Sequence, residues 1–171
     1  MSNKLVNGFI GLFGGLTTTV LGKRILVFII SLMPILELRG GLLAASLLDL
    51  DPVSSYIISV IGNIIPVPFI LWFMDKLLKW MKTRKTLKKT ALWLDKKVEK
   101  NKDKIEKLGF WGLVLFVGIP LPGTGAWTGC LVASVLEMDK KKSFLAALIG
   151  VIMASIIMMI LSFGVLKGIT G

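Results

Sequence analysis

The chain has 171 residues, of which 54% are hydrophobic, and its formal net charge is +11. A mean hydropathy of +0.81 places it among integral membrane proteins, because a soluble protein of this length does not need apolar runs that could cross a bilayer. The chain has no histidine and only one cysteine, which removes the commonest metal ligand, the usual catalytic base and any disulfide framework. We therefore expect a membrane protein that is not an enzyme and that has no metal or cofactor.

The first half of the chain contains a weak segment, a broken apolar element and one long apolar run. Residues 1–24 are mildly apolar and contain several glycines and threonines, so we expect an interfacial or loosely packed helix, with a full span as the alternative. Ile25–Leu48 is largely apolar but is interrupted near its middle. Val53–Met74 carries no charge and is long enough to cross a bilayer.

The interrupted element predicts a re-entrant hairpin. The arm before Pro34 has about nine residues, so as a helix it reaches roughly half of the hydrocarbon core. Pro34 cannot continue the hydrogen bonding of a helix, while Gly40 and Gly41 permit the dihedral angles of a sharp reversal. Two half-length helices would then meet near the midplane with Glu37 and Arg39 at their tip. The alternative is one full-length helix that is kinked at Pro34.

Most of the positive charge lies in the connector that follows. Residues 75–108 hold 13 of the 21 Lys and Arg residues and five acids, so they carry +8 of the +11. Apolar residues recur there at three-, four- and seven-residue steps, which predicts a basic amphipathic helix on the membrane surface. The positive-inside rule explains this charge more simply than nucleic-acid binding does. We expect the connector to be cytoplasmic, its Lys76–Lys107 surface to contact anionic lipid, and no nucleic acid to be a partner.

The second half of the chain has the same order of elements. Phe110–Ile119 is a half-length apolar arm that leads into PLPGTGAWTG, residues 120–129, and then into a second short arm. Ser143–Leu166 is long enough to cross the membrane once more. The second half therefore also predicts a hairpin followed by a spanning helix.

An internal repeat relates the two halves. At an offset of 88 residues, GLLAASLLDLD of residues 41–51 overlies GCLVASVLEMD of residues 129–139, and Pro34 overlies Pro122. If the broken elements are re-entrant, each half crosses the membrane once and the second half is inverted; if they span, the halves are parallel. The balance of Lys and Arg between the two sides does not distinguish these topologies. The short arms and the centres rich in proline and glycine favour the inverted one.

We therefore predict an all-α integral membrane protein with a single domain, residues 1–171, in the cell membrane. Two inverted-topology repeats, residues 25–74 and 109–168, each contain a re-entrant helical hairpin and a spanning helix. The basic amphipathic helix of residues 75–108 joins them. A homo-oligomer is compatible with the sequence.

A buried ionisable pair marks the candidate site. Charges inside the membrane are costly, so Glu37, the only acid placed deep there, is the candidate for a proton that binds and leaves, while Arg39 could hold an anion. The helix starts after Gly40 and Gly125 would add partial positive charge from their backbone amides. The candidate substrate- and proton-binding residues are Glu37, Arg39, Gly40, Gly123, Thr124, Gly125, Trp127 and Thr128; the candidate hairpin-forming residues are Pro34, Gly41, Pro120, Pro122 and Gly129. The alternative is that Glu37 and Arg39 only neutralise each other while the glycines allow close packing.

ELRGG, residues 37–41, and PLPGTGAWTG resemble the signature segments of the small multidrug export membrane proteins. The resemblance covers Ile25–Leu166 and implies an exporter. The paired hairpins around an acid and an arginine are more distantly similar to the DedA-like membrane proteins, which are associated with the flipping of undecaprenyl phosphate and other lipids. DedA-like proteins typically have an arginine in the second hairpin, and this chain has none there.

Three functions remain open at this point. The first is a proton-coupled secondary transporter or lipid flippase with its site between the two hairpin tips and a small-molecule or lipid substrate, of which an anionic, phosphate-lipid-like one is favoured. The second is an exporter of lipophilic cations with Glu37 as counter-ion. The third is a non-transporting membrane scaffold whose basic helix recruits a partner.

Overall fold

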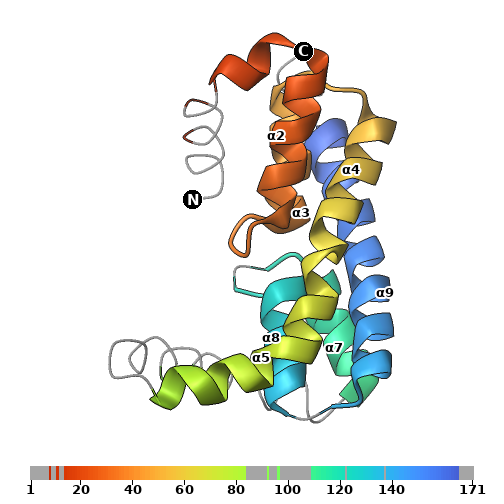
Figure 1. Ribbon diagram of the computed structural model, residues 1–171. Coiled ribbons are helices and arrows are strands. Elements are labelled where there is room, and N and C mark those ends of the chain that lie inside the picture. Colours follow the sequence, from red (N-terminus) through yellow and green to blue (C-terminus); the bar gives the residue numbers. More distant parts are fainter. Residues whose placement is uncertain are drawn as a thin grey trace. The chain divides into compact units, whose positions relative to one another are not determined.

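The computed structural model describes Gly8, Gly11, Leu92, Lys96 and residues 14–83, 109–121, 123–136 and 138–165. All regular elements in these residues are helices, so the all-α prediction is confirmed for this part of the chain (Figure 1). The chain divides into two compact units: unit 1 consists of Met1–Ile65 and Val151–Gly171, and unit 2 of Pro66–Gly150.

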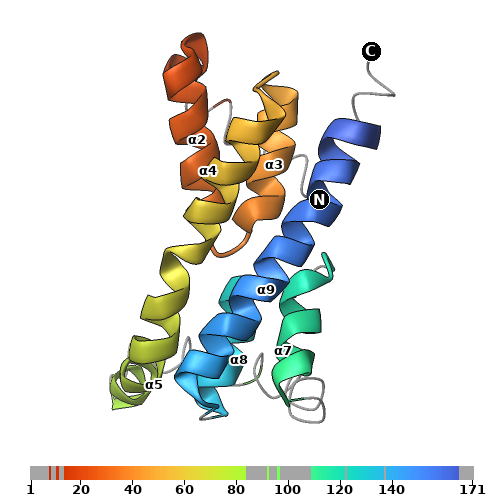
Figure 2. The ribbon, with the colours of Figure 1, turned by 90° about the vertical axis from the view of Figure 1, so that its right-hand side faces the viewer.

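Unit 1 is built around a helical hairpin. Its elements are the 3-10 helix η1 (Gly14–Thr18), α2 (Val20–Leu32), α3 (Glu37–Leu47), α4 (Pro52–Ile64), the part of α9 (Lys140–Met159) that follows Gly150, and the π-helix η2 (Ile160–Val165). Helices α2 and α3 pack against each other, α4 packs on both, and η2 contacts α3 (Figure 2). Ser46 Oγ donates a hydrogen bond to the carbonyl oxygen of Ser162 (2.6 Å), and Ser155 Oγ donates one to Tyr56 Oη (3.1 Å). These bonds join the C-terminal segment of unit 1 to α3 and α4.

Unit 2 contains a second hairpin. Its elements are α5 (Pro66–Thr83), α7 (Gly109–Gly118), α8 (Ala126–Val135) and α9 up to Gly150. Helix α7 packs against α8, and α5 packs against α8 as well. Helix α5 ends at Thr83, so the first residues of the basic connector are helical. The rest of the predicted surface helix, apart from Leu92 and Lys96, lies outside the described residues.

The helices that follow the two hairpins begin in the same way. Asp51 Oδ2 accepts a hydrogen bond from Ser54 N (2.8 Å) at the start of α4, and Asp139 Oδ1 accepts one from Lys142 N (2.8 Å) at the start of α9. Each carboxylate satisfies an amide that the helix itself leaves without a partner. Asp51 and Asp139 are 88 residues apart, so the offset found in the sequence recurs in the local structure of these segments.

The first arm of the unit 1 hairpin is longer than predicted. Helix α2 has 13 residues and begins at Val20, before the expected start at Ile25. The reason is local: Gly22 N donates a hydrogen bond to Thr19 Oγ1 (3.1 Å), which caps the helix at that point. Part of the segment expected to form a separate interfacial helix thus belongs to the hairpin.

The chain reverses before the two glycines and not at them. The turn consists of residues 33–36, and α3 begins at Glu37. Gly40 N donates a hydrogen bond to the carbonyl oxygen of Leu36 (2.9 Å), so Gly40 and Gly41 lie inside α3. The prediction that a helix starts after Gly40 is therefore wrong, and the amide of Gly40 is not available to an anion.

The first arms of the two hairpins follow a different offset from the rest of the repeat. A Cβ at Gly62 would lie 3.0 Å from the carbonyl oxygen of Phe28, and a Cβ at Gly150 would lie 2.9 Å from that of Val114. The two glycines are 88 residues apart, whereas Val114 follows Phe28 by only 86. The chain between equivalent positions of the first arm and the following helix is therefore two residues longer in the second half, and the ungapped alignment does not extend to the first arms.

Helices α4 and α9 bury small or polar residues and expose large apolar ones. The buried residues are Ser55, Ser59, Gly62 and Asn63 in α4, and Ser143, Ala146, Ala147, Gly150, Val151, Ala154 and Ser155 in α9. The exposed residues include Val53, Ile57 and Ile61 in α4, and Leu145, Ile149, Ile152 and Ile156 in α9. Water would favour the opposite distribution, whereas lipid accepts apolar faces and small residues let helices approach closely.

Two helical stretches among the described residues are long and apolar enough to cross a membrane. They are Pro52–Phe73, which contains α4 and the start of α5, and Lys140–Gly164, which contains α9. The first is interrupted at Ile65, immediately before Pro66, because proline has no amide proton to offer the preceding turn. Their lengths and their apolar outer faces agree with a membrane protein.

Candidate functional site

Glu37 occupies an unusual position at the start of α3. Its φ is +52°, a left-handed conformation that is uncommon for residues other than glycine, and its side chain is only 4% exposed. Glu37 N donates a hydrogen bond to the carbonyl oxygen of Met33 (2.9 Å), which holds the residue at the turn. A buried carboxylate on a strained backbone is a combination that concentrates at functional sites.

Arg39 lies two residues further along the same helical turn. Its side chain is half-buried, and its guanidinium interacts electrostatically with the Glu37 carboxylate. The structure therefore brings the two charged residues of the predicted site together. Because α2 and α3 pack as a hairpin, the pair sits beside the chain reversal and not on one continuous kinked helix.

The two glycines of α3 allow its neighbours to come close. A Cβ at Gly40 would lie 2.7 Å from Leu36 Cβ, and a Cβ at Gly41 would lie 3.0 Å from Ser59 Oγ and would also collide with Ser31 Oγ. Gly41 thus lies where α2, α3 and α4 meet. Its predicted role in the turn is wrong, and it serves helix packing instead.

Two polar residues of α4 complete this region, and the sequence analysis missed both. Ser59 and Asn63 are 0% and 1% exposed, and Ser59 Oγ and both polar atoms of the Asn63 amide have no hydrogen-bond partner. Helices α3 and α4 run antiparallel and Gly41 lies opposite Ser59, so one turn further along places Asn63 at the level of Glu37. The signal in the sequence was a pair of polar residues at i and i+4 within an apolar run. We call Glu37, Arg39, Ser59 and Asn63 the polar cluster.

Unit 2 has the same packing without the polar groups. A Cβ at Gly129, the equivalent of Gly41, would lie 2.8 Å from Val117, which stands where unit 1 has Ser31. The equivalent of Ser59 is Ala147, which is fully buried. The hairpin of unit 2 therefore packs with apolar residues where unit 1 has Ser31 and Ser59.

The turn of the second hairpin is stabilised by its own hydrogen bonds. Thr124 Oγ1 lies within hydrogen-bond distance of the carbonyl oxygens of Leu121 (2.8 Å) and Ile119 (2.9 Å), and its single proton can be donated to either, which holds the turn. Gly123 and Gly125 have φ of +85° and +130°, conformations that favour glycine. Gly125 is also the N-cap of α8, so the predicted helix start at this position is confirmed.

The remaining predicted residues of unit 2 lie in or beside α8. Trp127 is half-buried, Thr128 is buried, and Gly129 packs on α7. Pro120 follows the end of α7 by two residues, as Pro34 follows the end of α2, so Pro120 is the counterpart of Pro34 in position. The predicted equivalent, Pro122, lies outside the described residues. That the two hairpin turns share one site stays a prediction.

No three His, Cys, Asp or Glu side chains gather into a metal site among the described residues. In the comparison with protein families, a family described as "Putative small multi-drug export protein" matches residues 37–157, which include Glu37, Arg39 and the whole second hairpin. No curated protein and no solved structure matches the chain.

Proposed function

Because the chain belongs to the small multi-drug export protein family, we propose that it is a multi-pass transporter of the cell membrane whose substrate passes the polar cluster of unit 1. The family description supports transport in general terms. The location of the cluster supports the choice of site, and the proposed activity makes and breaks no covalent bond.

One observation carries the proposal: the buried face of α4 has polar side chains without hydrogen-bond partners, whereas its exposed face is apolar. Placing a charge in the membrane costs about 2.5–3.5 kcal/mol on insertion scales, and a buried polar group without a partner costs about 1–3 kcal/mol. Ser59 and Asn63 incur the second cost, whereas the residues 88 positions later, Ala147 and Val151, are buried and apolar. We therefore assign the unpartnered side chains of Ser59 and Asn63 to the binding of a ligand.

The chemistry of the cluster favours an anionic group. Arg39 and the Asn63 amide can donate hydrogen bonds to phosphate or carboxylate oxygens, and the planar guanidinium suits two parallel bonds. Glu37 is the group that can exchange a proton as the substrate enters and leaves. We therefore propose proton-coupled transport or flipping of a molecule with an anionic, phosphate-lipid-like headgroup.

A second candidate is the export of lipophilic cations, which is one form of the multidrug export that the family description names. Glu37 would then be the counter-ion of the substrate, and Arg39 would have to turn away from it. The two candidates differ in the effect of Arg39→Ala, which would abolish transport of an anion and improve that of a cation.

The proposed topology makes both hairpins re-entrant. Their arms have 13, 11, 10 and 10 residues, and helices of such lengths reach roughly half to two-thirds of a hydrocarbon core of about 30 Å. Pro52–Phe73 and Lys140–Gly164 would then make the crossings, one in each half, and the second half would be inverted. In this topology the connector of residues 75–108 is cytoplasmic and contacts anionic lipid.

The test uses Asn63→Leu, which removes the unsatisfied amide and keeps a similar volume. Filling the site with an apolar group should leave the melting temperature unchanged or raise it, since a buried group without a partner is lost. The same variant in proteoliposomes should not translocate a fluorescent phosphatidylglycerol or export ethidium. Ile57→Leu on the exposed face of α4 is the matched control and should behave as wild type. If Asn63→Leu melts lower and still transports, Asn63 is a structural residue and the proposed site is wrong.

A further inference from the structure

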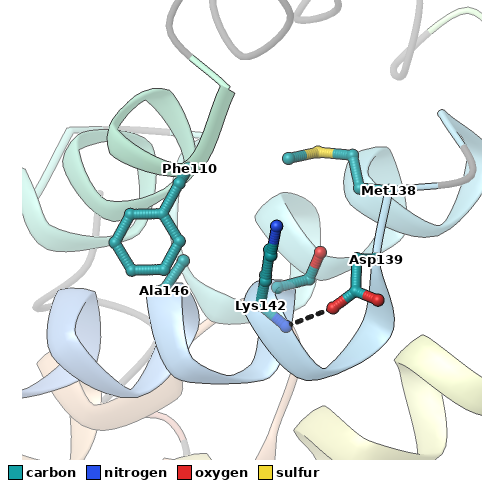
Figure 3. Close-up of a pocket in the computed structure, with 6 residues that line it drawn as sticks. Phe110, Met138, Asp139, Lys142 and Ala146 are labelled. Carbon is teal, nitrogen blue, oxygen red and sulfur yellow. Dashed lines mark hydrogen bonds between the residues drawn. The ribbon is translucent and has the colours of Figure 1, made fainter.

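A cavity of about 260 Å³ lies where α9 begins, remote in the sequence from the polar cluster. It is lined by Phe110, Met138, Asp139, Lys142, Ser143 and Ala146 (Figure 3). Since one water takes about 30 Å³ in the liquid, it has room for roughly eight waters, or for a small headgroup. Asp139 and Lys142 are exposed, so the cavity can be reached from outside the protein.

Ser143 contributes a hydroxyl that the protein itself does not use. Its side chain is 1% exposed, lines the cavity, and its Oγ has no hydrogen-bond partner. The equivalent residue in unit 1 is Ser55, whose Oγ donates to the carbonyl oxygen of Asp51 (2.7 Å). The hydroxyl at this helix position is thus hydrogen-bonded in unit 1 and buried without a partner in unit 2.

Lys142 and Asp139 place opposite charges at this cavity. Asp139 Oδ1 accepts the hydrogen bond from Lys142 N that caps α9, and the Lys142 side chain extends between Phe110 and Met138 (Figure 3). In unit 1 the position equivalent to Lys142 is Ser54, which carries no charge. A cation, a carboxylate and a buried hydroxyl without a hydrogen-bond partner therefore belong to residues that line one cavity beside apolar side chains.

The surroundings indicate where this cavity lies. It is at the first turn of a helix long enough to cross a membrane, and the next turns expose Leu145 and Ile149. A helix start with lysines followed by an exposed apolar face belongs at the boundary between headgroups and acyl chains. A phospholipid there presents its headgroup to the cavity and its acyl chains to α9.

We infer that this cavity binds the headgroup of a phospholipid with a primary amine, such as phosphatidylethanolamine. The Lys142 ammonium and the Ser143 hydroxyl donate to the phosphate, and the amine of the headgroup donates to the Asp139 carboxylate. An anionic headgroup without an amine would meet Asp139 unfavourably. A choline headgroup has no N–H to donate to it.

Binding can be measured on the full-length protein in detergent by native mass spectrometry, titrating phosphatidylethanolamine, phosphatidylcholine and phosphatidylglycerol of identical acyl chains. We expect phosphatidylethanolamine to bind most tightly. Lys142→Ala and Ser143→Ala should each weaken it by about three- to tenfold, in line with single hydrogen bonds to a charged group. Asp139→Asn, which can still cap α9, should remove the preference over phosphatidylglycerol.

Two matched control variants distinguish binding in the cavity from nonspecific electrostatic binding of lipid to the protein. Lys141→Ala removes the same charge from the same helical turn without touching the cavity, and Ser55→Ala removes the equivalent hydroxyl of unit 1. Both should bind phosphatidylethanolamine as wild type does. The inference is overturned if Lys141→Ala weakens binding as much as Lys142→Ala, if the three lipids bind equally, or if soluble glycerophosphoethanolamine displaces the lipid at equal concentration. The last result would assign the cavity to a free phosphate ester.

Discussion

Ser31 and Val117 occupy equivalent places in the two units, each against the glycine of the facing hairpin arm. Ser31 Oγ lies where a Cβ of Gly41 would stand, and Val117 Cγ2 lies 2.8 Å from a Cβ built at Gly129. Ser31 Oγ also donates a hydrogen bond to the carbonyl oxygen of Val27 (2.8 Å), so its polar group is satisfied within α2. One hairpin thus has a hydroxyl, bonded within its own helix, where the other has a methyl group, and both pack against the facing glycine.

The first prediction concerns the glycines at the crossings of α4 and α9 with the first arms. Gly62→Ala and Gly150→Ala should each lower the free energy of unfolding by about 1–3 kcal/mol, because the added methyl group meets a backbone carbonyl oxygen that cannot turn away. Thermal unfolding in detergent measures this. Gly15→Ala is the control, since a Cβ there has no neighbour within 4 Å. Equal melting temperatures for all three variants would contradict the close packing.

The second prediction concerns Glu37. Glu37→Gln should preserve the fold, because the amide keeps the shape and hydrogen bonding of the side chain, and should abolish coupled proton flux in proteoliposomes. An entrapped pH dye reports the flux after substrate is added outside, and circular dichroism reports the fold. Normal coupled transport by a folded Glu37→Gln protein would leave Glu37 as a structural partner of Arg39 only.

The third prediction concerns Arg39. Arg39→Lys keeps the charge but loses the planar two-donor contact, so it should reduce transport of an anionic substrate by about tenfold or more. The rate of fluorescent phosphatidylglycerol translocation is the measurement. The Lys23→Arg variant serves as control, because Lys23 Nζ donates a hydrogen bond to the carbonyl oxygen of Leu48 (2.9 Å), at the opposite end of the hairpin from Arg39. A wild-type rate for Arg39→Lys would exclude a bidentate contact.

The fourth prediction concerns topology. If the second hairpin is re-entrant, Lys141 lies on the cytoplasmic side. In a Cys130→Ser background, Lys141→Cys should therefore resist an impermeant thiol reagent in intact cells and react after permeabilisation. Lys141 is exposed at the start of α9, so burial does not protect it. Labelling in intact cells would mean that the second broken element spans, and the inverted repeat would be wrong.

The fifth prediction concerns the basic connector. A peptide of residues 76–107 should gain helicity on anionic vesicles and lose affinity steeply as salt increases, since each basic residue near the surface contributes about 1 kcal/mol at low salt. Circular dichroism of the peptide with anionic and with neutral vesicles, at several salt concentrations, measures its helicity and affinity. Equal affinity for neutral vesicles would show that apolar contacts, and not charge, hold the connector to the membrane.

The sequence by itself determined the class of the protein and the order of its elements. The sequence predicted helices from the long apolar runs, and two interruptions from Pro34 and from residues 120–129. It also predicted a repeat. These features depend on local hydrogen bonding and on hydropathy. It also identified Glu37 and Arg39, since charges within an apolar segment stand out in the sequence. The sequence missed the start of the first arm at Val20, because helix ends depend on capping contacts such as that of Thr19.

Only the tertiary structure decided which faces of the helices meet. Gly41 looked like a turn residue but is a packing contact, because the space it leaves is filled by Ser31 and Ser59 from two other helices. Asn63 was one polar residue in an apolar run, and its burial without a partner became visible only when α4 packed on α2 and α3. The open hydroxyl of Ser143 appeared in the same way. Local sequence specifies where helices start and stop, whereas the partners of a side chain come from segments far away in the chain.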